Sequence, residues 1–504
     1  MEAKVIVTAG TTPNLQSEME QATARANTAA DNANTAAENA NLAVDRITNL
    51  ESPYVENMAS YGVEWRTDQS APKVTRIGSA YLHKTLPIQS RIRGCLLDDN
   101  GQVVKYLNPL DWTHEVRDGS QGQVMVELPM HYRKFETETL LADGAEVTVC
   151  RVKISEYPLA GYHQVPTCYV SAYEAALDRT NSGSPKLASV VNMSTAFRGG
   201  MMSSTGADWS DWDGTFRTLL GRPVTGLSLN NFRTCARRRN GNATAEWNAY
   251  TIGIHEEIYW LYLIEYANRD SQALYNAALD SNGYRQGGLG MGVTTVGGTI
   301  ADGGDHDGEA TEDWKTFNKS RPFVPCGHTD SLGNRTGVVE YAVHDDITGA
   351  WEDQMVPRYR GIENPFGHIC KWTDGINIMI KPDTDANPTS DVYTCQDPSK
   401  FNDSNYDGYI CVGQYARTKG CVKDIIFGEY GSIMPKTVGG SSTIYFCDYH
   451  YTNIPSATTL RGVLLGGSAD QWTGAGLSYA ESSYAPSVTF YSFGSRLCFI
   501  PAKA

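Results

Sequence analysis

Acidic residues gather between glycines in one mid-chain loop, where they could chelate a cation. The run ADGGDHDGEATEDW holds Asp302, Asp305, Asp307 and Glu309, with Glu312 a few residues further on. Carboxylates on glycine turns are suitable ligands for hard cations such as Ca²⁺, but no Glu stands at the closing position of an EF-hand loop. We therefore expect a solvated insertion, with calcium at these residues as the alternative. No other cofactor is expected.

Two short pairs of Cys and His could supply zinc ligands if they met in space. They are Cys326 with His328, and His368 with Cys370. Zinc takes four such ligands in a tetrahedral site, but this close spacing is not that of a standard zinc knuckle. Cysteine and histidine inside a core are the commoner case, so we expect no zinc site.

No constellation for nucleophilic or acid–base catalysis can be placed in the sequence. It contains no P-loop and no GxSxG elbow, and no Ser, His and Asp can be grouped into a triad. Glycoside cleavage needs two carboxylates that flank one bond, and nothing singles out two among the many present. The sequence therefore predicts a protein that is not an enzyme.

The last stretch of the chain has the composition of a binding loop. Apolar, strand-like runs at Val463–Leu465 and Leu497–Ile500 enclose Ser, Gly, Ala and Thr with scattered aromatic residues. Neither a helical period nor strand alternation fits this middle part. Aromatic rings spaced by small residues supply contact area at low entropic cost, as in antibody paratopes. A binding loop is predicted, and a glycine-rich core loop with inward-pointing rings is the alternative.

An alanine heptad repeat precedes the rest of the chain. From Leu15 to Leu50, alanines occupy most a and d positions, with Met19 and Ile47 also at a. Sustained apolar residues at a and d indicate a coiled coil. Alanine buries little area, so this coil would be weak alone. A disordered low-complexity linker is the alternative, and Pro53 ends the helix.

Composition limits the class of protein and its compartment. The chain has 504 residues and a formal net charge of −15, which argues against general binding to nucleic acids. Its 11 cysteines include no CxxC pair, which indicates reduced thiols and assembly in cytoplasm. The start of the chain does not have the charged and apolar regions of a signal peptide. No apolar run reaches the length of a membrane span, so membrane insertion is not expected.

Helical patterns give way to strand patterns along the chain, which predicts an α+β fold. Helices are expected at VSAYEAALDR with Ser171 as cap, at Leu229–Arg239 with Ser228 as cap, and at Ile254–Ala267. The DDNG between Leu97 and Val103 predicts a hairpin. We predict an attachment segment (1–13), a coiled-coil stem (14–52), a β-rich neck (53–118) and a head (119–504).

The C-terminal frame LRGVLLGGS…AG…AP…GSRLCFI resembles the variable region of proteins diversified by diversity-generating retroelements. It is most similar to tail-fibre proteins of phages and prophages, with further likeness in LHKTLPIQSRIRGCLLDDNGQVVKYLNPLDW, MHYRKFE and NFRTCARRR. The resemblance covers the chain from about Tyr61 to Ala504. It implies that the head has a C-type-lectin-like fold related to formylglycine-generating enzymes, with its variable region at 461–504.

The resemblance implies a phage tail-fibre protein, a homotrimer that binds a host surface glycan or protein receptor through this variable loop. Its N-terminus would join other tail proteins; it would be made in the bacterial cytoplasm and reside in the virion tail. The alternative is a structural tail protein or adhesin without diversification. An enzyme of the formylglycine type is not expected, because Cys498 matches the frame but Gly476–Tyr479 supplies no reactive cysteine.

Retroelement mutagenesis of adenines favours certain residue types at the variable positions. The residues predicted to vary and to contact the receptor are Asp470, Trp472, Tyr479, Ser483, Tyr484, Val488, Phe490 and Tyr491. The favoured template codons are AAC and AAT, whose adenines can change to any base. Trp472, Gln471 and Glu481 cannot arise from these two codons and need other codons that contain adenine. The residues predicted to form the scaffold are Gly466, Gly467, Ala485, Pro486, Gly494, Arg496 and Cys498. The variable side chains are expected to project into solvent together.

Overall fold

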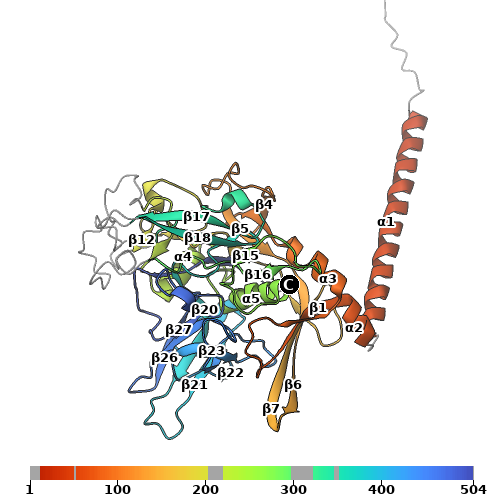
Figure 1. The fold of residues 1–504 in the computed structure, drawn as a ribbon. Helices are drawn as coiled ribbons and strands as arrows, with labels where there is room; N and C mark the ends of the chain where they lie inside the picture. Colours follow the sequence, from red (N-terminus) through yellow and green to blue (C-terminus); the bar gives the residue numbers. More distant parts are fainter. Residues whose placement is uncertain (1–11, 50–52, 202–218, 297–321, 345–350, 503–504) are drawn as a thin grey trace, which may run out of the picture.

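Strands dominate the architecture of this chain. The computed structural model describes residues 12–49, 53–201, 219–296, 322–344 and 351–502. Within the described residues, strands make up 34% and helices 18%, so this part of the molecule has a β-rich fold (Figure 1). The predicted class, an α+β fold with a C-type-lectin-like head on a coiled-coil stem, is therefore wrong. Many of the strands have only two to five residues, which is too short for a period to be detected in the sequence.

The N-terminal helix α1 (Thr12–Asn49) is a single helix and not a coiled-coil stem. All of its described side chains, at positions 17, 18 and 20–40, are exposed to solvent. The alanines at the predicted a and d positions in that range therefore pack against no other described element. Alanine has the highest helix propensity of all residues, so the repeat explains the helix without requiring a partner. Most of the predicted attachment segment lies outside the described residues.

The described parts of the chain hold four further α-helices: α2 (Pro53–Ala59), α3 (Ala80–Thr85), α4 (Leu229–Arg237) and α5 (Ile252–Tyr266). The predicted helices at α4 and α5 are confirmed. The Ser228 hydroxyl accepts a hydrogen bond from the Asn231 amide at the start of α4, and Thr251 caps α5 in the same way. α5 is buried over nearly its whole length, as its aromatic residues on all faces indicate.

The predicted helix at VSAYEAALDR is wrong. This segment forms strand β9 (Cys168–Ser171), a short bend and strand β10 (Ala176–Asp178). Ser171 is fully buried, and its hydroxyl donates to the Tyr173 carbonyl at 2.5 Å rather than capping a helix. Pairing with neighbouring strands has overridden the helix propensity of the alanines.

One sheet carries a long projecting hairpin. Its strands are β1 (Ser60–Arg66), β2 (Thr75–Gly78), β6 (His131–Ala142), β7 (Ala145–Ser155) and β8 (His163–Val165). Their order is β2-β1-β7-β6-β8. β1 pairs with β7 only as far as Val149, whereas β6 and β7 pair up to Ala142 and Ala145. The end of this hairpin therefore extends away from the body without a third strand (Figure 1).

A second sheet joins distant parts of the chain. Its strands are β3 (Arg93–Leu97), β4 (Val103–Tyr106), β5 (Gln123–Leu128), β9, β14 (Trp247–Ala249) and β29 (Leu497–Phe499). Their order is β14-β29-β9-β5-β3-β4. The predicted hairpin between Leu97 and Val103 is confirmed as β3–β4. Strands from 53–118 pair directly with strands from the rest of the chain, β1 with β7 and β3 with β5.

A third, nine-stranded sheet holds most of the C-terminal part. Its strands are β20 (Cys370–Ile380), β21 (Ser390–Thr394), β22 (Ile410–Gln414), β23 (Gly420–Ile425), β24 (Pro435–Val438), β25 (Tyr449–Thr452), β26 (Thr459–Leu465), β27 (Ala480–Ser482) and β28 (Phe493–Gly494). The order is β22-β21-β20-β26-β27-β25-β23-β24, and β28 runs parallel to β20. β26 is thus an interior strand.

Shorter sheets and single turns of helix complete the fold. The remaining strands are β11 (Lys186–Ala188), β12 (Gly200–Met201), β13 (Val224–Thr225), β15 (Tyr275–Asn276), β16 (Gln286–Gly287), β17 (Gly337–His344), β18 (Trp351–Tyr359) and β19 (Ile362–Glu363). The 3₁₀ turns are η1 (Gln89–Arg91), η2 (Thr195–Phe197), η3 (Arg238–Asn240), η5 (Asp330–Leu332), η6 (Pro398–Lys400) and η7 (Trp472–Gly474).

The main hydrophobic core surrounds α5. Trp260 on this helix stacks against Trp65 of β1, and Phe135 and Phe427 contact the same indole edge to face. Val463, Leu477 and Cys498 of the C-terminal segment belong to this core. None of the helices in the described parts of the chain combines the length and apolarity that a membrane span requires.

Candidate functional site

Both ends of the C-terminal segment are fixed within sheets. β26 lies between β20 and β27 in the nine-stranded sheet, and β29 lies between β14 and β9 in the six-stranded sheet. The predicted scaffold residue Arg496 is fully buried just before β29. Its guanidinium donates to the carbonyls of Ser171, at 3.1 Å, and Asn364, at 2.6 Å. The intervening residues therefore begin and end at rigid positions.

Two glycines turn the chain back after β26. Gly466 and Gly467 have φ values of 84° and 76°, a region that side chains other than glycine rarely adopt. A Cβ at Gly467 would lie 2.8 Å from the Cβ of Ala475, so this close packing also requires glycine. The prediction that both glycines belong to the scaffold is consistent with this geometry.

Residues 475–480, which we call the anchor, are all buried. The Leu477 amide donates to the Ser271 hydroxyl at 3.0 Å, and the Leu477 carbonyl bonds the His255 ring at 2.8 Å. The Ser478 amide donates to Oδ2 of Asp448 at 2.7 Å. The anchor is therefore tied to α5 and to the loop before β25 by polar contacts as well as by Leu477 in the core.

Asp448 is a buried carboxyl group beneath the anchor. It is 1% exposed, and burial raises its pKa well above the ordinary value, with a further contribution from Asp270. A Cβ at Gly476 would lie 2.2 Å from Oδ1 of Asp448, so the anchor backbone rests directly on this carboxyl group. A protonated Asp448 avoids the cost of a buried charge.

Two stretches on either side of the anchor reach the surface. Six predicted contact residues that are exposed or half-buried make up what we call the display surface: Asp470, Trp472, Ser483, Tyr484, Val488 and Phe490. The first two lie before the anchor and the other four after it. Their side chains are available to a partner to different degrees, from half-buried to largely exposed.

Trp472 is the most exposed aromatic residue of the display surface, at 55%. Its φ of 51° is uncommon for a residue other than glycine and costs conformational energy. The strained backbone is held by a hydrogen bond from the Trp472 amide to the Thr294 carbonyl at 2.8 Å. Gln272 holds the Trp472 carbonyl at 3.0 Å. The surrounding structure thus fixes a large apolar ring in solvent, which is a feature of binding sites.

The other rings of the display surface rest on a buried aromatic base. Tyr484 is 38% exposed, and its ring centroid lies 5.2 Å from that of Phe493. Phe490 also packs on Phe493, at 5.4 Å, and Val488 is half-buried against the same core cluster. These contacts limit the motion of the exposed faces, so a partner would meet pre-organised apolar area.

Two carboxyl groups lie on either side of the anchor. Oδ1 of Asp470 accepts a hydrogen bond from the Ser468 hydroxyl at 2.6 Å, and Oε2 of Glu481 accepts one from the Tyr479 hydroxyl at 2.9 Å. Burial raises the pKa of Glu481, and the charge of Asp470 adds to this effect. The display surface can therefore offer polar acceptors as well as apolar rings.

Two of the predicted contact residues do not reach solvent as expected. Tyr479 is 0% exposed and belongs to the anchor, so the prediction that it projects into solvent is wrong. Tyr491 is 9% exposed and begins a buried run up to Phe499. Residue type does not place a tyrosine at the surface, because a ring with a hydrogen-bonded hydroxyl is also stable in a core.

Sequence reasoning missed the tyrosines of β25. Tyr449 and Tyr451 are half-buried, and their ring centroids lie 4.6 Å apart. Tyr451 also contacts Tyr479, at 6.0 Å between ring centroids, and β25 pairs in parallel with β27. The alternation in the segment YHYT was a signal for a strand with both tyrosines on one face. They pack against the same core cluster as Val488 and Phe490.

The predicted metal candidates do not form a site in the described parts of the chain. The predicted calcium ligands lie outside the described residues; they are Asp302, Asp305, Asp307, Glu309 and Glu312. Among the residues that are described, no group of three or more His, Cys, Asp and Glu is placed to hold a metal. Cys326 contacts the Glu174 carbonyl instead, and His328 bonds the Glu340 carbonyl at 2.8 Å.

His368 belongs to a buried cluster that is not open to a substrate. Its Nδ1 bonds Glu174, and its Nε2 accepts from the amides of Phe323 and Val324 at 2.9 and 3.0 Å. Lys371 lies 2.9 Å from the same carboxylate, and all three side chains are at most 2% exposed. The cluster joins three segments of the core, and both nitrogens of the His368 ring are hydrogen-bonded.

No known protein family and no curated protein matches this chain.

Proposed function

We propose that this chain is the receptor-binding protein of a phage tail fibre, and that its display surface contacts a receptor on the host cell. The observation that carries the proposal is the division of the C-terminal segment into a buried anchor and surface stretches rich in aromatic and small residues. Such a division lets surface side chains change while the backbone stays fixed. Binding sites that must adapt use this arrangement.

The proposal includes the assembly and the location that the sequence resemblance implies. The chain would form a homotrimer, join other tail proteins through its N-terminus, and reside in the virion tail. Its C-terminal frame resembles variable regions rewritten by diversity-generating retroelements, so the display surface would differ between related phages. The receptor would be a glycan or a protein of the bacterial surface, and catalysis is not part of the proposed role.

The alternative is a structural tail protein or adhesin without diversification. Burial of Tyr479 and Tyr491 favours it, because two of the eight residues predicted to vary lie in the core. The neighbouring DNA separates the two functions. A near-copy of the segment that encodes residues 461–504, next to a reverse transcriptase gene, would establish diversification, and its absence from the phage genome would favour the alternative.

Binding of the purified chain to host cells tests the proposed role. Trp472→Ala and Tyr484→Ala each remove an exposed ring, and contact residues of this kind contribute most of the affinity at an interface. We expect at least about tenfold weaker binding for each variant. The matched control is Tyr430→Ala, since Tyr430 is 49% exposed and lies outside the C-terminal segment. Equal losses for the control and the two variants would contradict the proposal.

A further inference from the structure

A lysine and a glutamate lie side by side in the core, away from solvent. Lys371 is on the interior strand β20, and Glu174 is in the bend between β9 and β10. Both side chains are buried, and Nζ of Lys371 lies 2.9 Å from Oε1 of Glu174. Burying two charges costs free energy, which their attraction offsets only when the remaining hydrogen bonds are complete. A reaction that removes both charges is therefore favoured at such a place.

The hydrogen bonds of this pair are incomplete in the described parts of the chain. Nζ of Lys371 donates to the Gly367 carbonyl at 2.9 Å. Oε1 of Glu174 has no hydrogen-bond partner among the described residues, although Nζ is within ion-pair distance. The lysine nitrogen therefore lies against the carboxyl group without the direction of a hydrogen bond.

His368 holds the other oxygen of the Glu174 carboxyl group. Its Nε2 accepts from the amides of Phe323 and Val324, so a neutral ring carries its hydrogen on Nδ1. This Nδ1–H donates to Oε2 of Glu174. Burial lowers the pKa of His368, which keeps the ring neutral. A donor fixed at Oε2 stabilises negative charge that develops there when a nucleophile adds to the carboxyl carbon. We call Lys371, Glu174 and His368 the lysine cluster.

The lysine can supply that nucleophile. Burial lowers the pKa of Lys371, while Glu174 opposes this shift and Arg496 adds to it. Burial alone would raise the pKa of Glu174, but Lys371 and His368 outweigh it and lower the pKa, so the pair starts as ammonium and carboxylate. Oε1 is close enough to take the proton from Nζ and leave a neutral amine. Holding the two groups together removes the entropic cost of bringing them into contact.

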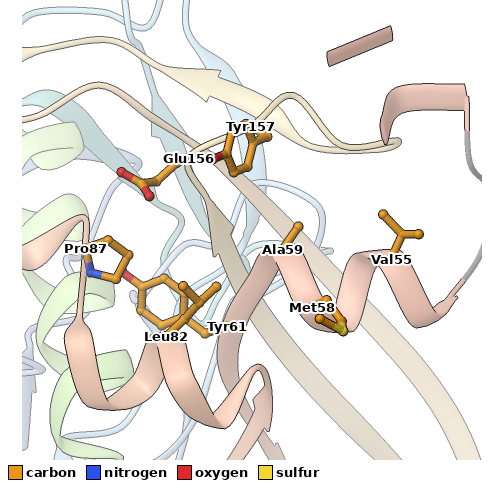
Figure 2. Close-up of a pocket in the computed structure, with 8 residues that line it drawn as sticks. All are labelled: Val55, Met58, Ala59, Tyr61, Leu82, Pro87, Glu156 and Tyr157. Carbon is orange, nitrogen blue, oxygen red and sulfur yellow. The ribbon is translucent and has the colours of Figure 1, made fainter. Parts of the chain in front are cut away.

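The lysine cluster is closed to external substrates. A cavity of about 410 Å³ opens at the surface beside α2 and α3 (Figure 2). It is lined by residues from these helices and from the turn after β7, such as Met58, Leu82 and Glu156, and by no member of the lysine cluster. The side chains of the cluster are at most 2% exposed. A reaction at the cluster therefore joins groups of this chain only.

We propose that the lysine cluster is a modification site, at which an amide bond forms between the side chains of Lys371 and Glu174. Nζ attacks Cδ of Glu174, so that an N–C bond forms and the bond from Cδ to Oε1 breaks. Of the three ammonium hydrogens, one stays on the amide nitrogen and two leave with Oε1 as water. Atoms and charge balance, and no oxidant or other reactant is needed. Nδ1–H of His368 holds Oε2, which becomes the amide oxygen.

The amide would fix the strand next to the turn that begins the C-terminal segment. Lys371 pairs with Leu465 at the end of β26. A Cβ on Gly466 would lie 3.4 Å from Cδ of Lys371, so the lysine stem rests against this turn. The bond would join this turn covalently to the bend at Glu174, which is distant in sequence. The inference does not rest on the proposed function, because it concerns only groups inside the core.

The mass of the purified full chain tests this bond. The unaltered chain should be lighter than its sequence requires by one water molecule. Proteolysis should release a fragment in which the peptide with Glu174 is joined to the peptide with Lys371, as fragment sequencing by mass spectrometry would show. A chain of full mass without such a fragment would overturn the proposal.

Two variants distinguish this bond from loss of water at other residues. Lys371→Met combined with Glu174→Gln removes the amine and leaves no buried charge of the pair unpaired. This double variant should have its full sequence mass and give no joined fragment. Lys423→Met is the matched control, since Lys423 is exposed, and it should keep both the loss of water and the joined fragment. Loss of water that persists in the double variant would place the reaction elsewhere and contradict the proposal.

Discussion

The anchor and the display surface are adjacent in sequence but differ in what their side chains contact. Tyr479 in the anchor is fully buried, whereas Tyr484, only a few residues later, is 38% exposed. The two tyrosines are chemically identical, so the fold and not the residue type decides their roles. Tyr479 lies among core residues and bonds Glu481, while Tyr484 rests on Phe493 with one face open. This difference shows how one segment can combine a fixed backbone with replaceable contacts.

The largest expected effect is on stability at the anchor. Tyr479→Ala should lower the free energy of unfolding by about 3–5 kcal/mol, the usual cost of truncating a buried aromatic ring. Tyr484→Ala should lower the free energy of unfolding far less, because only one face of the Tyr484 ring packs on the core and the other is open to solvent. Thermal or urea unfolding of the two variants gives the comparison directly. Similar losses in both would mean that the two regions do not differ in the way the burial values indicate.

A second test adds a single methyl group to the anchor. Gly476→Ala places a Cβ 2.2 Å from Oδ1 of Asp448, at a φ of 142°. Overpacking of this kind typically costs about 1–3 kcal/mol. Gly183→Ala is the control, because its nearest neighbour would be Oδ1 of Asn181 at 3.6 Å. Unfolding midpoints should fall for Gly476→Ala and stay close to the unaltered chain for Gly183→Ala.

The titration of Asp448 predicts how stability depends on pH. Its pKa is raised by burial in the folded chain, so it stays protonated at pH values where the unfolded chain ionises it. The stability from this group is complete below the ordinary carboxyl pKa and is lost as pH rises toward the folded pKa. Asp448→Asn keeps an acceptor for the Ser478 amide and removes the titration. Its stability should fall less between acid and neutral pH, and an unchanged pH profile would show that Asp448 is ionised when folded.

The smallest effect concerns the strained backbone at the display surface. Trp472→Asn replaces a residue at φ 51° with one that tolerates this conformation better. Relief of the strain should offset the lost packing, so stability should change by no more than about 1 kcal/mol. Binding to host cells should nevertheless fall, because the exposed ring is gone. A large loss of stability would show that the indole supports the fold.

Sequence patterns predicted the parts of the fold that carry strong local signals. The hairpin at DDNG, the capped helix α4 and the aromatic helix α5 follow from turn residues, caps and burial on all faces. The β-rich class could not be predicted, because most strands are short and pair with residues distant in the chain. The alanine heptads were misleading, since alanine favours a helix whether or not a partner is present.

The candidate site was predicted only in part for the same reason. Gly466 and Gly467 were identified as scaffold because positive φ at glycine is a local property. The burial of Tyr479 depends on Tyr451 and on pairing of β27 with β25 and β26. Those contacts come from other parts of the sequence, and residue type carries no information about them.

Adsorption of phage particles to host cells shows whether the display surface binds the receptor. Particles would carry Ser483, Tyr484 and Val488 replaced together by alanine, and unfolding of the purified variant would be measured in parallel. We expect adsorption to fall at least about tenfold, while the free energy of unfolding falls by less than it does for Tyr479→Ala. Unchanged adsorption by particles that carry this variant would contradict the claim that the display surface binds the receptor.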